Sequence, residues 1–486
     1  MIKLIFRACL SIALPFLQVT VLATASPTIP NRMDGSHPVA HESFSIWTPR
    51  AHNPAFVQAG DSMLIEIMAD SSWRESGWSA TVKNDFATWP CQVLSAKWDA
   101  IHHQTSKGWV LTIQLPGDVP PELVGLAVSH ASGKTALAER AVHVVPDLEA
   151  DFYILHQSDQ HLTQDSAGEP GGTAGERWSG GTKEALNWLA PVVNLINPRL
   201  VFQTGDNMQL YNRADEWCGM EEAKVRVARF MEGLAGFEVP TVLATGNHDL
   251  GWGDYVDIKA WRKQYTEQVG QRAFSFRMGS MYVLNTEWTS NEFLDWARAD
   301  YARSWNDPTV KYRLLVSHFY DGLEGWTNIA TAAYPSDLLL VGHNHRTRVL
   351  QTEPFTVLSV GSAQDFQRAA FFNFRRTASG WTSEQPAMHA DGITVHRMLG
   401  DYGKPTVSAS YERENDGTAS ANSVWIANDL PHDFYDGRVR FVMKKGRYQV
   451  TGGNVLAQYD TDDGEKTVVL VKVNIRQNAK TQVMID

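Results

Sequence analysis

The sequence of 486 residues is poor in cysteine and in positive charge. It contains three cysteines and no CxxC pair, which excludes a disulfide scaffold and a zinc site of that type. Of these, Cys91 and Cys218 either form one disulfide in an oxidising compartment or remain thiols. The formal net charge of −11 leaves no cationic excess for binding a nucleic-acid duplex. An acidic protein can still bind a phosphate group where metal ions carry the local positive charge.

Long apolar runs are also absent after the first 25 residues, so the sequence predicts no transmembrane segment. Residues 1–25, MIKLIFRACLSIALPFLQVTVLATA, begin with Lys3 and Arg7, continue with an apolar run and end in small residues. This pattern is typical of a secretory signal peptide. We therefore expect cleavage near Ala25 and export to the periplasm or the extracellular space.

Composition divides the remaining chain into four parts. Residues 26–45 are rich in Pro, Ser and His and are predicted to be a linker. Residues 46–147 contain short β-like runs separated by Gly, Pro, Asp and Ser, which favours an N-terminal Ig-like β-sandwich. Residues 148–378 alternate apolar strands with helical patterns and are predicted to be an α/β domain. Residues 379–486 return to the period-two pattern of a β-rich domain.

Two helices are predicted within the α/β part. Over 183–196, Leu186, Leu189, Val193 and Ile196 recur with helical spacing, and a similar apolar face runs through 221–235.

Five apolar strands in this part end in residues of metal-ligand type. These are Asp159 and His161 after ILHQ, Asp206 and Asn207 after VFQTG, Asn247, His248 and Asp249 after VLATG, His318 after LLVS, and His343, Asn344 and His345 after LLLVG. In open α/β sheets, ligands bind at the carboxyl ends of the strands. The five clusters are therefore expected to converge on one crevice.

The residue types indicate two metal ions that share a bridging carboxylate. Mixed imidazole, carboxylate and amide ligation suits Zn, Fe, Mn, Co or Ni better than Ca or Mg. Taken singly, each residue also has a structural explanation. Asp159 and Asp206 are suited to cap helices, Asn247 to a turn, and His318 to a buried hydrogen bond. It is the ordered series of five clusters that favours the metal centre.

The motifs DxH, GDN, GNHD, a lone strand-end His and GHxH, in this order, resemble those of the calcineurin-like metallophosphoesterase family over residues 148–378. The resemblance implies a sandwich of β-sheets flanked by helices. Asn207, Met208 and Gln209 follow Asp206, so the chain lacks the tyrosine of the purple acid phosphatases. It also lacks the second aspartate and the arginine of the GDxxDRG motif of the protein serine/threonine phosphatases.

The resemblance also implies a role for each residue of the series. The first metal would be bound by Asp159, His161 and His345, the second by Asn247, His318 and His343, and both by the bridging Asp206. His248 would donate to the scissile phosphate. Asp249 would either orient His248 or be structural. A hydroxide held between the metals then attacks phosphorus in line.

The function expected from these residues is that of an exported two-metal phosphoesterase. A phosphodiester substrate is favoured because no basic cluster is present to hold a dianionic monoester. A phosphomonoesterase with the same residues and a surface or carbohydrate-binding protein, with glycan contact through the β-domains, are the alternatives. Aromatic candidates for the rim of the site are Tyr211, Trp252, Tyr320 and Trp326.

Overall fold

The computed structural model describes residues 32–33, 44–100, 107–164, 181–211, 217–251, 256–287, 293–320, 329–330, 334–351, 355–363, 368–383, 388–389, 392–393, 397–401 and 404–486. The predicted signal peptide and most of the predicted linker lie outside these residues. None of the helices in this part of the chain is long and apolar enough to cross a membrane.

The N-terminal part is a single sheet of eight strands in the order β2-β4-β7-β6-β5-β8-β9-β3. Its strands are β2 (Ser45–Thr48), β3 (Ala55–Val57), β4 (Ser62–Met68), β5 (Trp78–Lys83), β6 (Thr88–Ala100), β7 (Lys107–Gln114), β8 (Leu123–His130) and β9 (Thr135–Val144). The long strand β6 pairs first with β5 and then with β7. It therefore joins two halves whose buried side chains, such as Leu111 and Val124, share one core. The Ig-like type of this sheet stays a prediction.

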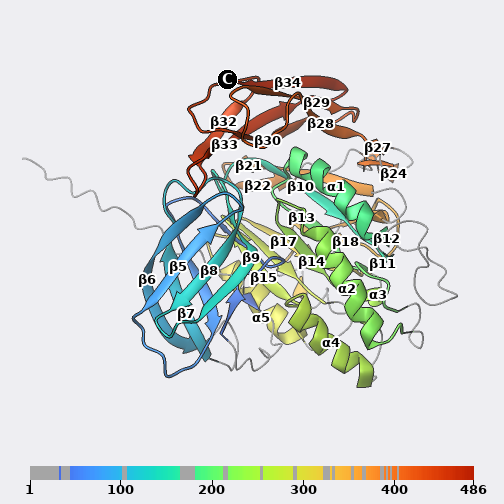
Figure 1. The fold of residues 1–486 in the computed structure, drawn as a ribbon. Coiled ribbons are helices and arrows are strands. Elements are labelled where there is room, and N and C mark those ends of the chain that lie inside the picture. The colour runs from blue at the N-terminus through green and yellow to red at the C-terminus, as the bar shows by residue number, and fades with distance from the viewer. Residues whose placement is uncertain are drawn as a thin grey trace, which may run out of the picture.

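The central part contains two sheets (Figure 1). The first consists of β14 (Thr241–Ala244), β13 (Val201–Thr204), β10 (Phe152–Gln157), β21 (Arg368–Thr377) and β22 (Gly380–Ser383), with β25 (Arg397–Met398) paired to β21. The second consists of β1 (Arg32–Met33), β15 (Phe274–Met278), β16 (Met281–Asn285), β17 (Tyr312–Val316), β18 (Leu338–Val341), β20 (Thr356–Ser359) and β19 (Arg348–Gln351). Apolar side chains of both sheets, among them Ile154, Phe202, Val283 and Leu314, form one fully buried core. The β1 pairing with β15 places part of the expected linker in the second sheet.

Strand direction in these sheets explains where polar residues collect. In the first sheet β10, β13 and β14 are parallel, and in the second sheet β16, β17, β18 and β20 are parallel. Each of these strands is almost completely buried, as expected for parallel strands covered on both faces. The polar clusters therefore occur where the strands end.

Helices cover the outer faces of the two sheets (Figure 1). They are α1 (Lys183–Ile196), α2 (Met220–Leu234), α3 (Asn247–Leu250), α4 (Val256–Gln268) and α5 (Leu294–Asn306). The predicted helix over 183–196 is confirmed, and Thr182 caps it by accepting a 3.0 Å hydrogen bond from the Ala185 amide. Helices α1, α2 and α4 share a core with the first sheet, whereas α5 packs on the second.

The C-terminal part is β-rich and packs on α1. One sheet contains β28 (Val407–Tyr411), β29 (Asn422–Asn428), β34 (Ala479–Ile485) and β31 (Val450–Thr451), and the other contains β30 (Phe434–Lys444), β33 (Lys466–Ile475) and β32 (Asn454–Asp460). Two-residue strands complete the chain: β12 (Gly181–Thr182), β23 (Met388–His389), β24 (Gly392–Ile393), β26 (Gly400–Asp401) and β27 (Lys404–Pro405), with the three-residue β11 (Leu162–Gln164) paired to β12. Buried residues from both C-terminal sheets, among them Val424 and Val471, belong to the same core as α1, so the C-terminal part supports the first central sheet.

A charged junction joins the three parts. Arg440 of β30 pairs with Glu122 of the N-terminal sheet and, at 2.6 Å, with Glu238 of the central part. Tyr459 and Asn84 also donate hydrogen bonds to Glu122, at 2.9 and 3.0 Å. Burial acts to raise the pKa of Glu122, but the charges of Arg440 and Arg438, together with the hydrogen bonds from Arg440 and Tyr459, outweigh it and lower that pKa. The ionised carboxylate therefore stabilises the junction above its ordinary pKa, and this stabilisation is lost as the pH falls through the lowered value.

Substitution of Arg440 tests this junction. Arg440→Met leaves the buried Glu122 carboxylate without its cation, and breaking such a pair costs about 3 kcal/mol. We expect a clear fall in the midpoint of thermal or chemical unfolding. Lys445→Met is the matched control because its pair with Asp460 is exposed, and its loss is expected to cost less than about 1 kcal/mol. Equal midpoints for the two variants would contradict the role given to Arg440.

Candidate metal centre

The nine residues predicted to form the site follow five strands whose carboxyl ends meet at one edge of the central sheets. Three of the strands, β10, β13 and β14, belong to the first sheet, and two, β17 and β18, belong to the second. Seven of the residues supply ligand atoms to three overlapping groups, and within each group these atoms lie within 4.8 Å of one another. The groups are Asp159, His161 and His345; His161, Asp206 and His248; and Asp206, His318 and His343.

Backbone strain is concentrated at these strand ends. Five site residues have positive φ angles: Asp159 (56°), His161 (47°), Asp206 (50°), His343 (67°) and His345 (50°). Only three other non-glycine residues in the described part of the chain share this conformation. Each such residue costs about 1–3 kcal/mol. The fold therefore gives up stability to turn these side chains toward a common point.

Asp206 lies at the centre of the site. Its Oδ2 atom is 3.0 Å from Nε2 of His318 and 3.9 Å from Nε2 of both His161 and His248. Its Oδ1 atom accepts a 2.8 Å hydrogen bond from the backbone amide of His248. Burial acts to raise the pKa of Asp206, but the neighbouring histidines outweigh it and lower that pKa. This buried carboxylate is thus ionised and contacts members of all the groups.

Gly246 provides the space for this carboxylate. Its backbone is extended, with φ −112° and ψ −178°, so the conformation itself does not require glycine. A Cβ atom at this position, however, would lie 2.1 Å from Oδ1 and 2.4 Å from the backbone nitrogen of Asp206. Any side chain here must therefore displace the Asp206 loop.

Gly246→Ala is expected to lower turnover at this site on the order of a hundredfold, the scale of a misplacement of about 1 Å. The metal content of the purified protein should fall with it. Gly117→Ala is the control, because a Cβ at Gly117 meets no atom within 4 Å. Normal metal content and turnover in the Gly246 variant would show that the loop tolerates the displacement.

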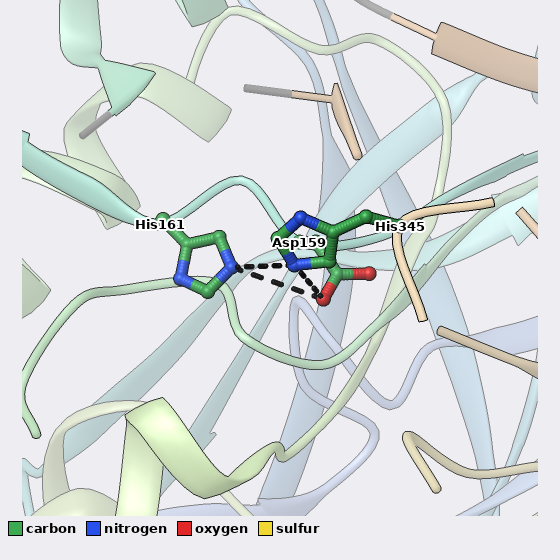
Figure 2. A group of neighbouring side chains, drawn as sticks. All are labelled: Asp159, His161 and His345. Carbon is green, nitrogen blue, oxygen red and sulfur yellow. Dashed lines mark hydrogen bonds and ion pairs between the residues drawn. The ribbon is translucent and has the colours of Figure 1, made fainter. Parts of the chain in front are cut away.

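The first group joins β10 to the loop after β18. Oδ1 of Asp159 lies 3.1 Å from Nε2 of His345 and 3.8 Å from Nε2 of His161, and the two imidazole nitrogens are 3.2 Å apart (Figure 2). Burial lowers the pKa of His161 to about 4, so its imidazole is neutral near pH 7. For Asp159, the opposing effect of burial is outweighed by the hydrogen bond from His345 and the charge of His318, and the pKa is lowered. Both are in the form that binds a metal ion.

The third group joins β17 to β13 and β18. His318 is fully buried, and its Nδ1 atom donates a 2.7 Å hydrogen bond to the carbonyl of Thr204. This leaves Nε2 to face Asp206. Burial acts to lower the pKa of His318, but the Asp206 carboxylate raises it to about 9. Oδ1 of Asn247 is 3.1 Å from Nδ1 of His343, so the amide joins this group as well.

The donor set fits two metal ions. It offers two buried carboxylates, four imidazoles of the first and third groups and one amide oxygen, all turned toward one another. This mixture of oxygen and nitrogen donors is suited to Zn, Fe, Mn, Co or Ni. Asp206 lies between the first and third groups, as a bridging ligand would.

His248 lies on the open side of the centre and belongs to the second group. Its side chain is 16% exposed, compared with 0–2% for Asp159, His161, Asp206 and His318. Its Nε2 atom faces Asp206, and its Nδ1 atom contacts the carbonyl of Tyr211 and, at 2.8 Å, Nε2 of Gln209. The sequence alone assigns Gln209 no role. It shows a glutamine three residues after Asp206, but not that this side chain lies against histidines that follow two other strands.

Asp249 has contacts other than those expected. Oδ1 accepts a 2.8 Å hydrogen bond from the Met208 amide, and Oδ2 accepts bonds from the Gly246 amide and the Asn207 side chain, at 2.8 and 3.2 Å. Burial and the charge of Asp206 raise the pKa of Asp249 to about 7. These bonds tie the loop after β13 to the loop after β14. They favour the structural role for Asp249, and the ring of His248 is held by other residues.

The remaining predictions concern aromatic residues and cysteines. Tyr211 is only 2% exposed and packs within the core, so its prediction as a rim residue is wrong. Tyr320 is half-buried beside the core of the second sheet, and Trp252 and Trp326 lie outside the described residues. Cys91 and Cys218 are not joined by a disulfide bond.

Comparison with known proteins addresses the central part of the chain. Residues 152–347 match the model of the calcineurin-like phosphoesterase family. No curated protein matches the sequence.

Solved structures that resemble the chain cover about half of it. A dimetal phosphatase from Danio rerio is 13% identical, with 51% of this chain and 98% of that chain covered and a TM-score of 0.36. A putative 5'-nucleotidase from Staphylococcus aureus is 10% identical, with 51% and 53% covered and a TM-score of 0.28. Phosphopantetheinyl hydrolase from Mycobacterium tuberculosis is 13% identical, with 49% and 98% covered and a TM-score of 0.24.

Proposed function

We propose that this protein is a two-metal phosphoesterase acting on a phosphodiester, because residues 152–347 match the model of the calcineurin-like phosphoesterase family. The observation that carries the proposal is the set of three overlapping donor groups around Asp206. When bound, the metal ions supply Lewis-acid activation of water and neutralise charge on the phosphoryl oxygens. Asp159, His161 and His345 would hold the first ion, His318, His343 and Asn247 would hold the second, and Asp206 would contribute to both.

The protein's own residues then position the ester and handle the proton. His248 is the most exposed member of its group, and its Nε2 atom points away from the Tyr211 carbonyl that anchors Nδ1. In the protonated form it donates a hydrogen bond to a phosphoryl oxygen and gives its proton to the departing alkoxide. Asp159, His161, Asp206 and His318 are buried on the other side of the centre, so the substrate approaches past His248 and the partly exposed His345.

The charges around the centre support a diester. Every ion pair that Asp159 and Asp206 form among the described residues is with a histidine. Lysine and arginine take no part in these pairs. A diester carries one negative charge, so the metals and His248 suffice to bind it, whereas a dianionic monoester gains more from additional cations.

The test combines metal analysis with two substrates. We expect about two metal ions per chain and faster hydrolysis of bis-p-nitrophenyl phosphate than of p-nitrophenyl phosphate. The opposite substrate order would keep the metal centre and assign a phosphomonoesterase. Absence of metal and of hydrolysis after addition of Mn, Zn, Fe, Co or Ni would overturn the proposal in favour of a surface or carbohydrate-binding protein.

We also propose that the protein is exported, on the pattern of residues 1–25. Protein recovered from the periplasm or the medium should then begin near Ser26, as N-terminal sequencing would show. Retention of residues 1–25 in the cell interior would contradict export without affecting the proposed chemistry.

A further inference from the structure

Gln209 contacts two histidines that have different roles in the proposed function. Its side chain is fully buried between them. Oε1 lies 2.7 Å from Nδ1 of His161, and Nε2 lies 2.8 Å from Nδ1 of His248. The two imidazole rings are themselves edge to face, with centroids 4.8 Å apart. One neutral side chain thus touches a ligand of the first metal and the residue that faces the phosphate.

The orientation of the Gln209 amide follows from its neighbours. Nε2 lies 2.9 Å from the carbonyl of Tyr211, which can only accept a hydrogen bond, so the NH₂ group must face it. Oε1 then faces His161 and accepts a hydrogen bond from its Nδ1–H group. His161 consequently presents its Nε2 lone pair to Asp159, Asp206 and His345, which is the tautomer that metal binding requires.

The same amide helps to hold the ring of His248. The carbonyl of Tyr211 is contacted both by Nε2 of Gln209 and by Nδ1 of His248. The three atoms form a compact cluster that leaves Nε2 of His248 on the side of Asp206. Loss of the amide would remove one of the contacts that fix the ring.

The backbone of Gln209 is hydrogen-bonded through both its N–H group and its carbonyl, which fixes the point from which its side chain extends. Its backbone N–H group donates a hydrogen bond to the carbonyl of Leu162 in β11. Its carbonyl accepts a hydrogen bond from the fully buried Arg226 of α2, which also donates to Glu222 at 2.8 Å. Helix α2 and strand β11 therefore set the position of the Gln209 backbone.

From these contacts we propose that Gln209 is a positioning residue that fixes His161 and His248 in one mutual arrangement, and so couples the first metal site to the proton donor. The proposal rests on the proposed function for the role of His248. Its part concerning His161 depends only on metal binding.

The test compares Gln209→Met with Gln203→Met. Gln203 is an equally buried glutamine of β13 whose side-chain amide donates a 3.1 Å hydrogen bond to Gln157 rather than contacting a histidine of the metal centre. Removing a residue that orients a metal ligand typically weakens metal affinity about 10–100-fold. We therefore expect a loss of this size for Gln209→Met, measured by titration of the metal-free protein with Zn or Mn, and near-normal affinity for Gln203→Met.

The His248 half is tested by a double-mutant cycle with His248→Ala. In the wild-type background, Gln209→Met should reduce turnover more for alkyl leaving groups than for p-nitrophenol. In the His248→Ala background this difference should disappear, because the residue through which Gln209 acts is gone. Persistence of the difference would contradict a role through His248.

Other outcomes separate the two proposals. Metal affinity and leaving-group dependence equal to those of Gln203→Met would overturn the role of Gln209 and leave the proposed function intact. A wild-type protein that binds two metals but cleaves no ester would overturn the proposed function, and metal titration would still decide the His161 half.

If Gln209→Met does not fold, Gln209→Glu is used. It keeps an acceptor for His161 and loses the donor to Tyr211, so metal affinity should survive while leaving-group dependence becomes steeper. Loss of metal affinity in that variant, or unchanged leaving-group dependence, would overturn the corresponding half.

Discussion

Replacement of Asp206 by asparagine should abolish hydrolysis of both mono- and diester substrates. The substitution keeps the size of the side chain but removes the charge that lies between the first and third donor groups. We expect turnover to fall at least about a thousandfold, which corresponds to roughly 4 kcal/mol of transition-state stabilisation. Steady-state kinetics with p-nitrophenyl esters, together with elemental analysis of the same sample, measures the effect.

The amide at position 206 is also expected to leave the fold intact. Asp206 is buried among histidines, which can become neutral once the carboxylate is gone, so no unpaired buried charge remains. The Oδ1 atom of asparagine can still accept the hydrogen bond from the His248 amide. Circular dichroism should therefore match the wild type. Asp151→Asn is the matched control, because Asp151 is exposed and pairs with Arg375 before β10 begins. Substantial activity in a correctly folded Asp206→Asn variant would remove the bridging role from this residue.

Replacement of His248 by alanine should lower turnover about 10²–10⁴-fold, the usual contribution of a general acid. The loss should depend on the substrate. Leaving groups that depart readily as anions, such as p-nitrophenolate, need little protonation, whereas alkoxides need it most. Turnover measured over a series of phosphodiesters with leaving groups of increasing pKa should therefore decline more steeply for the variant than for the wild type.

Metal content provides the control for this experiment. His248 shares a donor group with His161 and Asp206, but the first and third groups are complete without it. The His248→Ala protein should therefore retain about two metal ions. A uniform loss across all leaving groups would argue against proton donation, and loss of one metal ion would instead make His248 a ligand.

Much of the site was predictable from local sequence because each part of it is a short-range signal. An apolar run followed by metal-ligand residues specifies a buried strand and the side chains at its end. This pattern occurs at β10, β13, β14, β17 and β18, and a glycine lies between the run and the ligand residues after β13, β14 and β18. The helix over 183–196 was predictable for the same reason, since its buried face recurs within a few turns. These signals depend on neighbours in the chain.

Long-range pairing was less accessible to sequence reasoning. The segment VRFVMKKGRYQV, with apolar residues on both sides of Lys444, Lys445 and Gly446, is typical of a hairpin that turns at these three residues. In the structure β30 pairs with β33, while the short strand β31 pairs with β34. Alternation of apolar residues specifies a strand and its buried face, but many strands offer a suitable partner. The choice among them depends on packing over the whole domain.

The sequence by itself determined which residues can bind metals, in which order they follow the strands, and that the chain has an acidic, cysteine-poor character. Only the tertiary structure decided that the strand ends come from two facing sheets, that Asp206 lies between the donor groups, and that Gln209 and the Thr204 carbonyl orient the imidazoles. It also gave Asp249 contacts with two loops and none of the contacts that hold the His248 ring. The physical reason is that ligand chemistry resides in single side chains, whereas orientation depends on hydrogen bonds between residues such as His318 and Thr204, which lie far apart in the chain.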